Sequence, residues 1–277
     1  MFGAACAATA AERRYYFDNT ADSNTGLVQH TVNGFFQDRT GFIWIATQGG
    51  LHKYDGYRIR VYEHAADDPD SLPSGFITAI AQDASDALWV GTRTAGIAKL
   101  DPASGKAQAF ALPAAAPNAP WRNAIRALKF DPARGMWVVT EAGIELVDPA
   151  SAQRRDVISF DAPPRAGGDA ATLILDAEGG LWAATDQGLW RVAPHANSGQ
   201  RIAAETIGAA RGVVATRDGE IYVSTANGLF HVDAGKNRAD PVWPGDNASG
   251  SASSRNAFDV IEDPQGKLWI AVPGEGL

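Results

Sequence analysis

The chain has 277 residues and a formal net charge of −8, with 45% hydrophobic and 20% charged residues. This composition is typical of an ordinary globular protein rather than a disordered one. No basic stripe is available to neutralise phosphates, which argues against nucleic-acid binding. No run of about 18 apolar residues predicts a membrane span.

The N-terminal segment is small and apolar before it turns polar at Glu12. Ala8-Thr9-Ala10 fits the small-x-small pattern that precedes a signal-peptidase cut. Residues 1–11 are therefore interpreted as a residual signal peptide, with a disordered N-terminus as the alternative. Residues 12–26 form a polar lead-in to the folded part. The single cysteine, Cys6, leaves no internal disulfide to be formed.

From residue 27 onward, one sequence unit returns imperfectly down the chain. Each copy has a polar turn, a short apolar strand with an aromatic residue, a Gly turn and a second strand. The recurring aromatic residues are Trp44, Trp89, Trp137, Trp182, Tyr222 and Trp269. A repeat of roughly 40–50 residues that is built of short strands indicates a β-propeller.

The first unit shows what one copy contains. Its four predicted strands, in chain order, are Val32–Gln37, Ile43–Ala46, Leu51–Tyr54 and Arg58–Tyr62. Four strands joined by short turns form an antiparallel meander, which is the usual propeller blade. We name the strands of each blade a to d in chain order. Residues 27–277 are therefore predicted to be an all-β, incomplete propeller with five complete blades and a partial sixth.

Later units follow the same plan. The second begins with a strand at Phe76–Ala81 and ends with one at Ala107–Leu112, and the third ends with Val157–Phe160. The linker Pro113–Pro120 is rich in Ala and Pro, and no helix of useful length is predicted in it or elsewhere.

Three residue types recur at fixed places, and each predicts a structural role. The aromatic series is expected to fill the space between adjacent blades. A carboxylate six residues before the aromatic is expected to accept backbone N–H groups in the a–b turn. These residues are Asp38, Asp83, Asp131, Asp176 and Asp263, with Thr216 in the fifth unit. A threonine three residues after the aromatic is expected to satisfy backbone groups of the b–c turn; the series is Thr47, Thr92, Thr140, Thr185 and Thr225.

Positions that differ between the copies are where binding specificity is expected. In a meander, the b–c turns and the connections from strand d to the next strand a lie at the same end, around one mouth of the central channel. The candidate ligand-binding residues there are His30, Gln48, Arg93, Asn123, Glu141, Asp186, Asn227 and Arg255. Unlike polar side chains around a mouth suit a small ligand. The alternative is a solvated rim that binds nothing.

Catalytic and metal chemistry have little support in the sequence. The five histidines are scattered without metal-ligand spacing, no Ser lies in a nucleophile elbow, and no carboxylate pair stands apart from the repeats. No metal, cofactor or catalytic residue is predicted.

Residues 72–83, 88–92 and 34–55 together resemble the two-component regulator propeller repeat. That repeat builds the periplasmic sensor region of bacterial hybrid histidine kinases and of some membrane-bound diguanylate cyclases. The resemblance implies a seven-bladed ring, of which this chain is a fragment. It also implies a periplasmic location and, as partners, the rest of the receptor chain: missing blades, a membrane span and an output domain. A homodimer through the full-length receptor and a small-molecule or oligosaccharide ligand are further implications.

Three hypotheses remain from the sequence. The first is a non-enzymatic, extracytoplasmic ligand-sensing propeller that acts in signal transduction through a kinase or cyclase. The second is a propeller lyase or hydrolase, which requires an acid/base or metal cluster at the channel mouth. The third is a protein-interaction scaffold that uses a broad face of the propeller.

Overall fold

The computed structural model describes residues 31–111, 118–160, 171–244 and 256–273. The expectations for residues 1–11 and 12–26, for His30 and Arg255, and for the chain end at Leu277 lie outside the described residues. Within these ranges the chain forms 22 strands and one helix of four residues.

Five four-stranded sheets follow one another along the chain, and each is an antiparallel meander in sequence order. Blade 1 contains β1 (Val32–Gln37), β2 (Ile43–Thr47), β3 (Leu51–Tyr54) and β4 (Ile59–Tyr62); blade 2 contains β5 (Ile77–Gln82), β6 (Leu88–Thr92), β7 (Ile97–Leu100) and β8 (Ala107–Phe110). Blade 3 contains β9 (Ile125–Asp131), β10 (Gly135–Thr140), β11 (Gly143–Val147) and β12 (Arg154–Ser159). Blade 4 contains β13 (Thr172–Leu175), β14 (Leu181–Thr185), β15 (Gly188–Val192) and β16 (Gln200–Ile202). Blade 5 contains β17 (Ala210–Ala215), β18 (Ile221–Thr225), β19 (Gly228–Asp233) and β20 (Arg238–Trp243); β21 (Asp259–Glu262) and β22 (Leu268–Ala271) pair in a sixth sheet.

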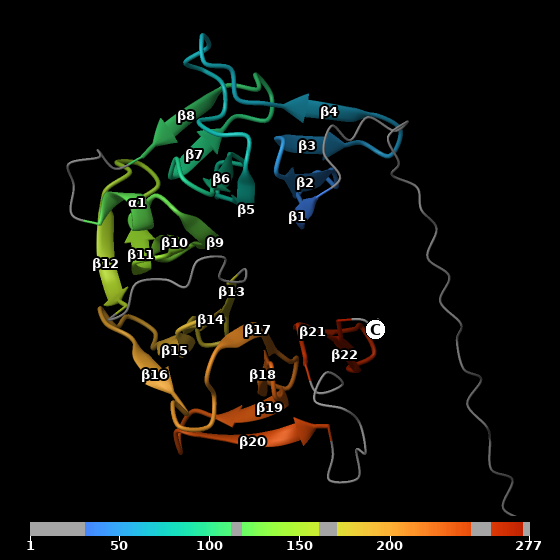
Figure 1. Ribbon diagram of the computed structural model, residues 1–277, viewed down its shortest axis with the longest axis vertical. Coiled ribbons are helices and arrows are strands. Elements are labelled where there is room, and N and C mark those ends of the chain that lie inside the picture. Colours follow the sequence, from blue (N-terminus) through green and yellow to red (C-terminus); the bar gives the residue numbers. More distant parts are fainter. Residues whose placement is uncertain (1–30, 112–117, 161–170, 245–255, 274–277) are drawn as a thin grey trace, which may run out of the picture.

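The sheets are arranged around a common axis (Figure 1). The first strand of each sheet lies nearest the axis and the fourth lies at the rim. Consecutive inner strands contact one another, from β1 to β5 and onward to β21. The predicted all-β propeller of antiparallel blades is therefore confirmed.

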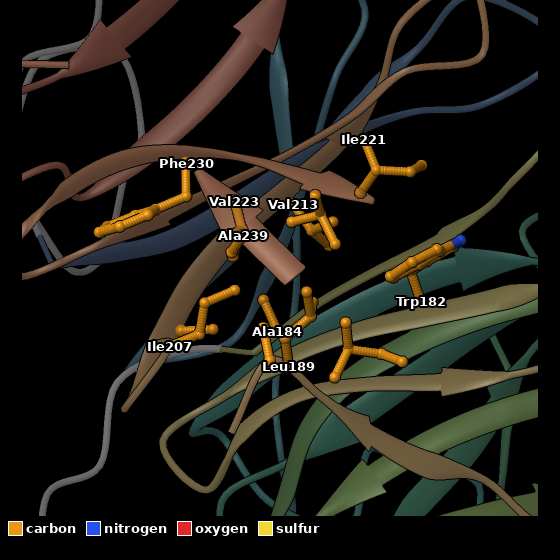
Figure 2. Packing of buried hydrophobic residues seen from close by; sticks show 13 residues of the cluster. Trp182, Ala184, Leu189, Ile207, Val213, Ile221, Val223, Phe230 and Ala239 are labelled. Atoms are coloured by element: carbon orange, nitrogen blue, oxygen red, sulfur yellow. The ribbon is translucent and has the colours of Figure 1, made fainter. Parts of the chain in front are cut away.

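The hydrophobic core lies between neighbouring blades. Trp44, Trp89 and Trp137 are fully buried, and Trp182 is 2% exposed. Figure 2 shows the interface of blades 4 and 5, where Trp182 lies in one cluster with Val213 and residues of β18 and β19. The predicted packing role of the aromatic series is confirmed for these four tryptophans.

The carboxylate that precedes each tryptophan has two roles, of which the sequence predicted one. In blade 2, Asp83 Oδ1 accepts N–H bonds from Ser85 (2.8 Å) and Ala87 (3.2 Å), which confirms the turn role. Asp83 Oδ2 also accepts the indole N–H of Trp89 at 2.9 Å. We call this arrangement the Asp–Trp clip. It recurs with oxygen–nitrogen distances of 2.7 Å in blade 1, 3.2 Å in blade 3, and 2.9 Å in blade 4 and in the sixth sheet.

The threonine series holds every b–c turn in the same way. Each hydroxyl donates to the carbonyl oxygen of a glycine three or four residues later, at 2.8–3.2 Å. The same hydroxyl oxygen accepts a backbone N–H within the turn. The predicted role is confirmed in all five blades.

Several strand ends differ from the sequence-based expectation by one or two residues, and two larger differences occur in and before blade 3. The linker between blades 2 and 3 contains a helical turn, α1 (Ala119–Arg122), where no helix was expected. Strand β12 begins at Arg154, three residues before the predicted start at Val157. Both differences trace to charge: Glu145 binds Arg122 Nε at 2.7 Å and Arg154 Nε at 2.5 Å. These bonds hold the helical turn and the polar start of the strand against the sheet.

Candidate functional site

The channel end of the inner strands is shaped by β-bulges. In β1 the register passes from Val32 opposite Thr47 directly to Gly34 opposite Ala46, so Asn33 has no cross-strand partner. The same irregularity occurs at the start of three other inner strands. The extra residues are Asn33, Thr78, Arg126 and Arg211. A bulge bends the strand locally and redirects a side chain, and bulges are over-represented beside active sites.

Three of these bulge residues line one cavity in the channel. Asn33, Thr78 and Arg126 lie on its wall together with Ala171, just before β13, and the cavity volume is about 210 Å³. The Thr78 hydroxyl is buried without a hydrogen-bond partner among the described residues. A polar cavity of this size can hold ordered water or part of a small polar ligand.

Arg126 connects this cavity to the predicted mouth. Its guanidinium pairs with Glu141, which lies in the b–c turn of blade 3, and the two side chains are 10% and 15% exposed. Arg126, Glu141 and Asp186 also line a smaller hollow between blades 3 and 4. The structure thus brings two of the predicted residues, Glu141 and Asp186, from adjacent blades to a shared hollow.

The b–c turns lie against the connections that lead into the next strand a, as the meander requires. The Glu141 N–H donates to the carbonyl oxygens of Trp121 and Ala124, both at 3.1 Å. In the same way, the Arg93 N–H donates to Phe76 O at 3.0 Å. The expectation that turns and connections share one end of the channel is therefore confirmed.

Three other predicted residues lie away from both hollows. Gln48 and Asn227 are exposed on their turns. Arg93 is partly buried, with its guanidinium carbon 5.8 Å from the centre of the Phe76 ring. These side chains surround the mouth at this end of the propeller without lining the described cavities.

Asn123 is buried and hydrogen-bonded within the protein, unlike the exposed residues of the mouth. It is 7% exposed, its carbonyl oxygen accepts the Gly96 N–H at 2.9 Å, and its side-chain oxygen accepts a bond from Arg154 at 3.5 Å. Arg154 belongs to the buried group around Glu145, whose hydrogen bond raises the pKa of Arg122. Replacing Asn123 is therefore expected to affect stability as well as any binding.

The bulge residues were not among the sequence-based candidates. Those candidates come from the b–c turns and from the connections into strand a, whereas Asn33, Thr78 and Arg126 lie within strand a, eleven residues before the aromatic. A polar residue at the same place in several otherwise apolar inner strands was the available signal.

Two features of the described ranges concern metal sites and membrane-spanning helices. These residues include no group of three or more His, Cys, Asp or Glu side chains arranged to hold a metal ion. They also include no helix with the length and apolar character of a membrane span.

Comparison with family models finds one match, over residues 71–94, to the model described as two component regulator propeller. Blade 2 carries a two component regulator propeller repeat. The matched residues cover the end of the connection from blade 1, strand β5 and strand β6. The resemblance seen in the sequence is thereby confirmed. No curated protein matches the chain.

Solved structures with the same fold come from several protein classes. The extracellular domain of a hybrid two component system from B. thetaiotaomicron aligns over 92% of this chain and 40% of its own, with 19% identity and a TM-score of 0.54. Virginiamycin B lyase from Staphylococcus aureus aligns over 88% of this chain and 78% of its own, with 13% identity and a TM-score of 0.65. PorZ, a surface component of the type-IX secretion system of Porphyromonas gingivalis, aligns over 87% and 36%, with 17% identity and a TM-score of 0.59.

These comparisons establish the propeller fold. The chain spans less than half of the length of the B. thetaiotaomicron domain. The three structures include a receptor domain, a lyase and a secretion component, so the shared fold does not by itself assign an activity.

Proposed function

We propose that this chain is part of the extracytoplasmic ligand-sensing propeller of a bacterial signal-transduction receptor, of the two-component kinase or diguanylate cyclase type. Its ligand is a small molecule or an oligosaccharide that binds at the channel mouth. The observation that carries this proposal is the placement of unlike polar residues on bulges at the channel end of the inner strands.

The division between constant and variable positions supports a binding role. The threonine hydroxyls hold the b–c turns of all five blades in the same way, yet the side chains presented beside them differ in charge and size. Rigid scaffolds that present varied loop residues are the usual arrangement of binding sites. A merely solvated rim does not require the inward-facing Arg126 and Thr78.

The chemistry of the mouth suits a ligand with many hydroxyl groups. Arg126 supplies planar donors, and Glu141 and Asp186 supply acceptors in the adjoining hollow. Asn33 carries two donor hydrogens and an acceptor oxygen; one N–H donates to Ile77 O at 2.6 Å, which leaves the second N–H and the side-chain oxygen. Such mixed donors and acceptors match hydroxyls, which both donate and accept.

The proposed receptor context rests on the repeat match and the B. thetaiotaomicron domain. In that context the partners are the remainder of the receptor chain and, through the full receptor, a second copy. The propeller itself is proposed to be non-enzymatic and periplasmic, with the output step carried by another domain.

A binding experiment on the purified chain tests the mouth directly. Calorimetric titration with a panel of oligosaccharides is expected to find a saturable ligand, and Glu141→Gln and Arg126→Gln are expected to weaken it about tenfold or more. Lys53→Gln, on strand β3 facing the other end of blade 1, is the matched control and is expected to leave the affinity unchanged. Equal affinity in the wild type and both mouth variants contradicts this site.

A further inference from the structure

A second cavity lies at the opposite end of the propeller, between blades 4 and 5. Its wall includes the a–b turns of both blades, at Asp176–Glu178 and Thr216–Glu220, and its volume is about 560 Å³. This volume falls within the range of about 300–1,000 Å³ that is common for small-molecule sites. We call it the groove. The mouth proposed above is formed by b–c turns, so the two sites share no residue.

Most of the carboxylates in the groove already have partners within the protein. Asp176 accepts the indole N–H of Trp182 at 2.9 Å. Glu220 pairs with His231, and the Asp233 carboxylate binds the Lys236 ammonium at 2.8 Å. Glu178 is the exception, because its only described side-chain contact is with Arg191, at 3.7 Å.

Among the described residues, Arg191 is a cation of the groove that donates no hydrogen bond to a protein group. Its terminal nitrogen lies 3.9 Å from Asp176 and 3.7 Å from Glu178, too far for hydrogen bonds in either case. Its Nε atom is buried and has no hydrogen-bond partner in the described part of the chain. The guanidinium lies 5.3 Å from the Trp182 ring centre, and the side chain is 23% exposed.

The equivalent residue of blade 2 shows that the blade can satisfy such a cation. Lys99 lies opposite its tryptophan in strand β7, as Arg191 does in β15, and it reaches Asp83 at 2.8 Å. A buried guanidinium nitrogen without a hydrogen bond, such as Arg191 Nε, is unusual, because buried polar groups are nearly always paired. The unmet requirement in the groove is therefore a hydrogen-bond acceptor for Arg191.

Blade 5 departs from the repeat on the opposite wall of the same groove. Thr216 stands where other blades have the clip aspartate, and His231 stands where blades 1, 2 and 4 have Lys or Arg. The His231 ring packs at a tilt against Tyr222, with ring centres 5.2 Å apart, and its Nε2 atom pairs with the Glu220 carboxylate. Departures from an internal repeat that gather on one cavity indicate a local role for that cavity.

We propose that the groove binds a free amino acid with an apolar side chain. The ligand carboxylate accepts hydrogen bonds from the terminal nitrogens of the Arg191 guanidinium, which offers a planar fork of donors. A plain anion meets an excess of carboxylates in this cavity, whereas a zwitterion also supplies an ammonium group for Glu178 and Glu220. The apolar side chain packs on Ala177, Ala215 and Ala234, which line the remaining wall.

Calorimetric titration of the purified chain with L-leucine and L-valine tests this proposal. The expected result is saturable binding of one molecule per chain. N-acetyl-L-leucine lacks the ammonium group and L-leucinamide lacks the carboxylate, so each is expected to bind about tenfold more weakly or worse. No binding of either amino acid up to roughly 10 mM, or equal affinity for leucine and both derivatives, overturns the proposal.

Variants locate the binding within the molecule. Arg191→Gln is expected to weaken leucine binding about tenfold or more, and Glu178→Gln, which changes an exposed side chain, is expected to weaken it less. Lys53→Gln alters the corresponding strand position of blade 1, and Glu141→Gln alters the mouth; both are expected to bind leucine as the wild type does. If the Arg191→Gln variant does not fold, the affinity of the Glu178→Gln variant for leucine tests the groove instead. Leucine binding with wild-type affinity in every folded groove variant overturns the assignment, and so does loss of leucine binding in Glu141→Gln. The oligosaccharide titration tests the mouth separately, so its result does not depend on the result for leucine.

Discussion

Blades 2 and 5 have the same four-stranded meander, but the a–b turn is fastened to the sheet differently. In blade 2, Asp83 joins the turn to the indole of Trp89 and also receives Lys99. In blade 5 the turn residue is Thr216, whose hydroxyl bonds only with the Glu220 backbone, and the aromatic is Tyr222. Aspartate and tryptophan are therefore absent together. The four-stranded meander of blade 5 therefore forms without the Asp–Trp clip.

The largest expected effect comes from removing the buried aromatic. Trp89→Ala should lower the free energy of unfolding by about 3–5 kcal/mol, because a fully buried ring is lost and a cavity remains. Tyr222→Ala should cost clearly less, because Tyr222 is partly exposed and carries no clip. Urea denaturation of both variants checks the difference. Equal losses would contradict the distinction between the two blades.

Removing the carboxylate should have the next largest effect. Asp83→Ala leaves the Trp89 indole N–H buried without an acceptor and Lys99 without its partner, so a loss of about 2–3 kcal/mol is expected. Thr216→Ala removes only a hydroxyl from an exposed turn, and a loss below about 1 kcal/mol is expected. The two midpoints in urea, measured at the same pH, give the comparison. If the Thr216 variant were as unstable as the Asp83 variant, the Asp–Trp clip would contribute no more to stability than the Thr216 hydroxyl does.

Acid should weaken blade 2 through the same carboxylate. Burial by itself raises the pKa of Asp83, but hydrogen bonds from Lys99, Ser85 and Trp89 outweigh it and hold the pKa at about 2. Because the folded pKa lies below the ordinary aspartate value of 3.8, Asp83 stabilises the fold fully above about pH 4, and this stabilisation is lost as the pH falls toward 2. Unfolding free energies of wild type and Asp83→Asn should converge over that interval. A constant difference from pH 6 to pH 2 would contradict this assignment.

The smallest effect is expected from building a clip into blade 5. Thr216→Asp and Tyr222→Trp should each change stability little or unfavourably when made alone, because each introduces only half of the pair. Together they should show a favourable coupling of about 1 kcal/mol in a double-mutant cycle. His231 and Glu220 remain in place, so the cycle reports the new contact alone. Additive free-energy changes would show that the two new side chains do not interact in this blade.

The repeat made much of the fold predictable. An aromatic residue every 40–48 residues between turn residues located the blades, and the threonine series located each b–c turn. The second role of Asp83 was not visible, because the contact of a turn residue with an indole six positions later depends on how the strand folds back. The Glu145 group was missed for a similar reason, since one of its arginines lies in the helical turn α1 and the other begins strand β12.

The candidate site was predictable only in part. The variable turn residues were identified because they follow the threonine series directly, and the structure brings Glu141 and Asp186 to one hollow. Arg126 was missed, because a bulge breaks the alternation of inward and outward side chains on which strand patterns depend. Sequence periodicity reveals the residues that alternate along regularly paired strands. A bulge residue has no cross-strand partner, so the periodicity does not reveal it.

The bulges have a consequence for how such a propeller can change over generations. A residue without a cross-strand partner does not help to set the register, so its replacement leaves the strand pairing of its blade intact. Asn33, Thr78, Arg126 and Arg211 already show an amide, a hydroxyl and two guanidinium groups on one backbone position. Mutation can therefore explore the lining of the channel one blade at a time, while selection for folding acts on other positions.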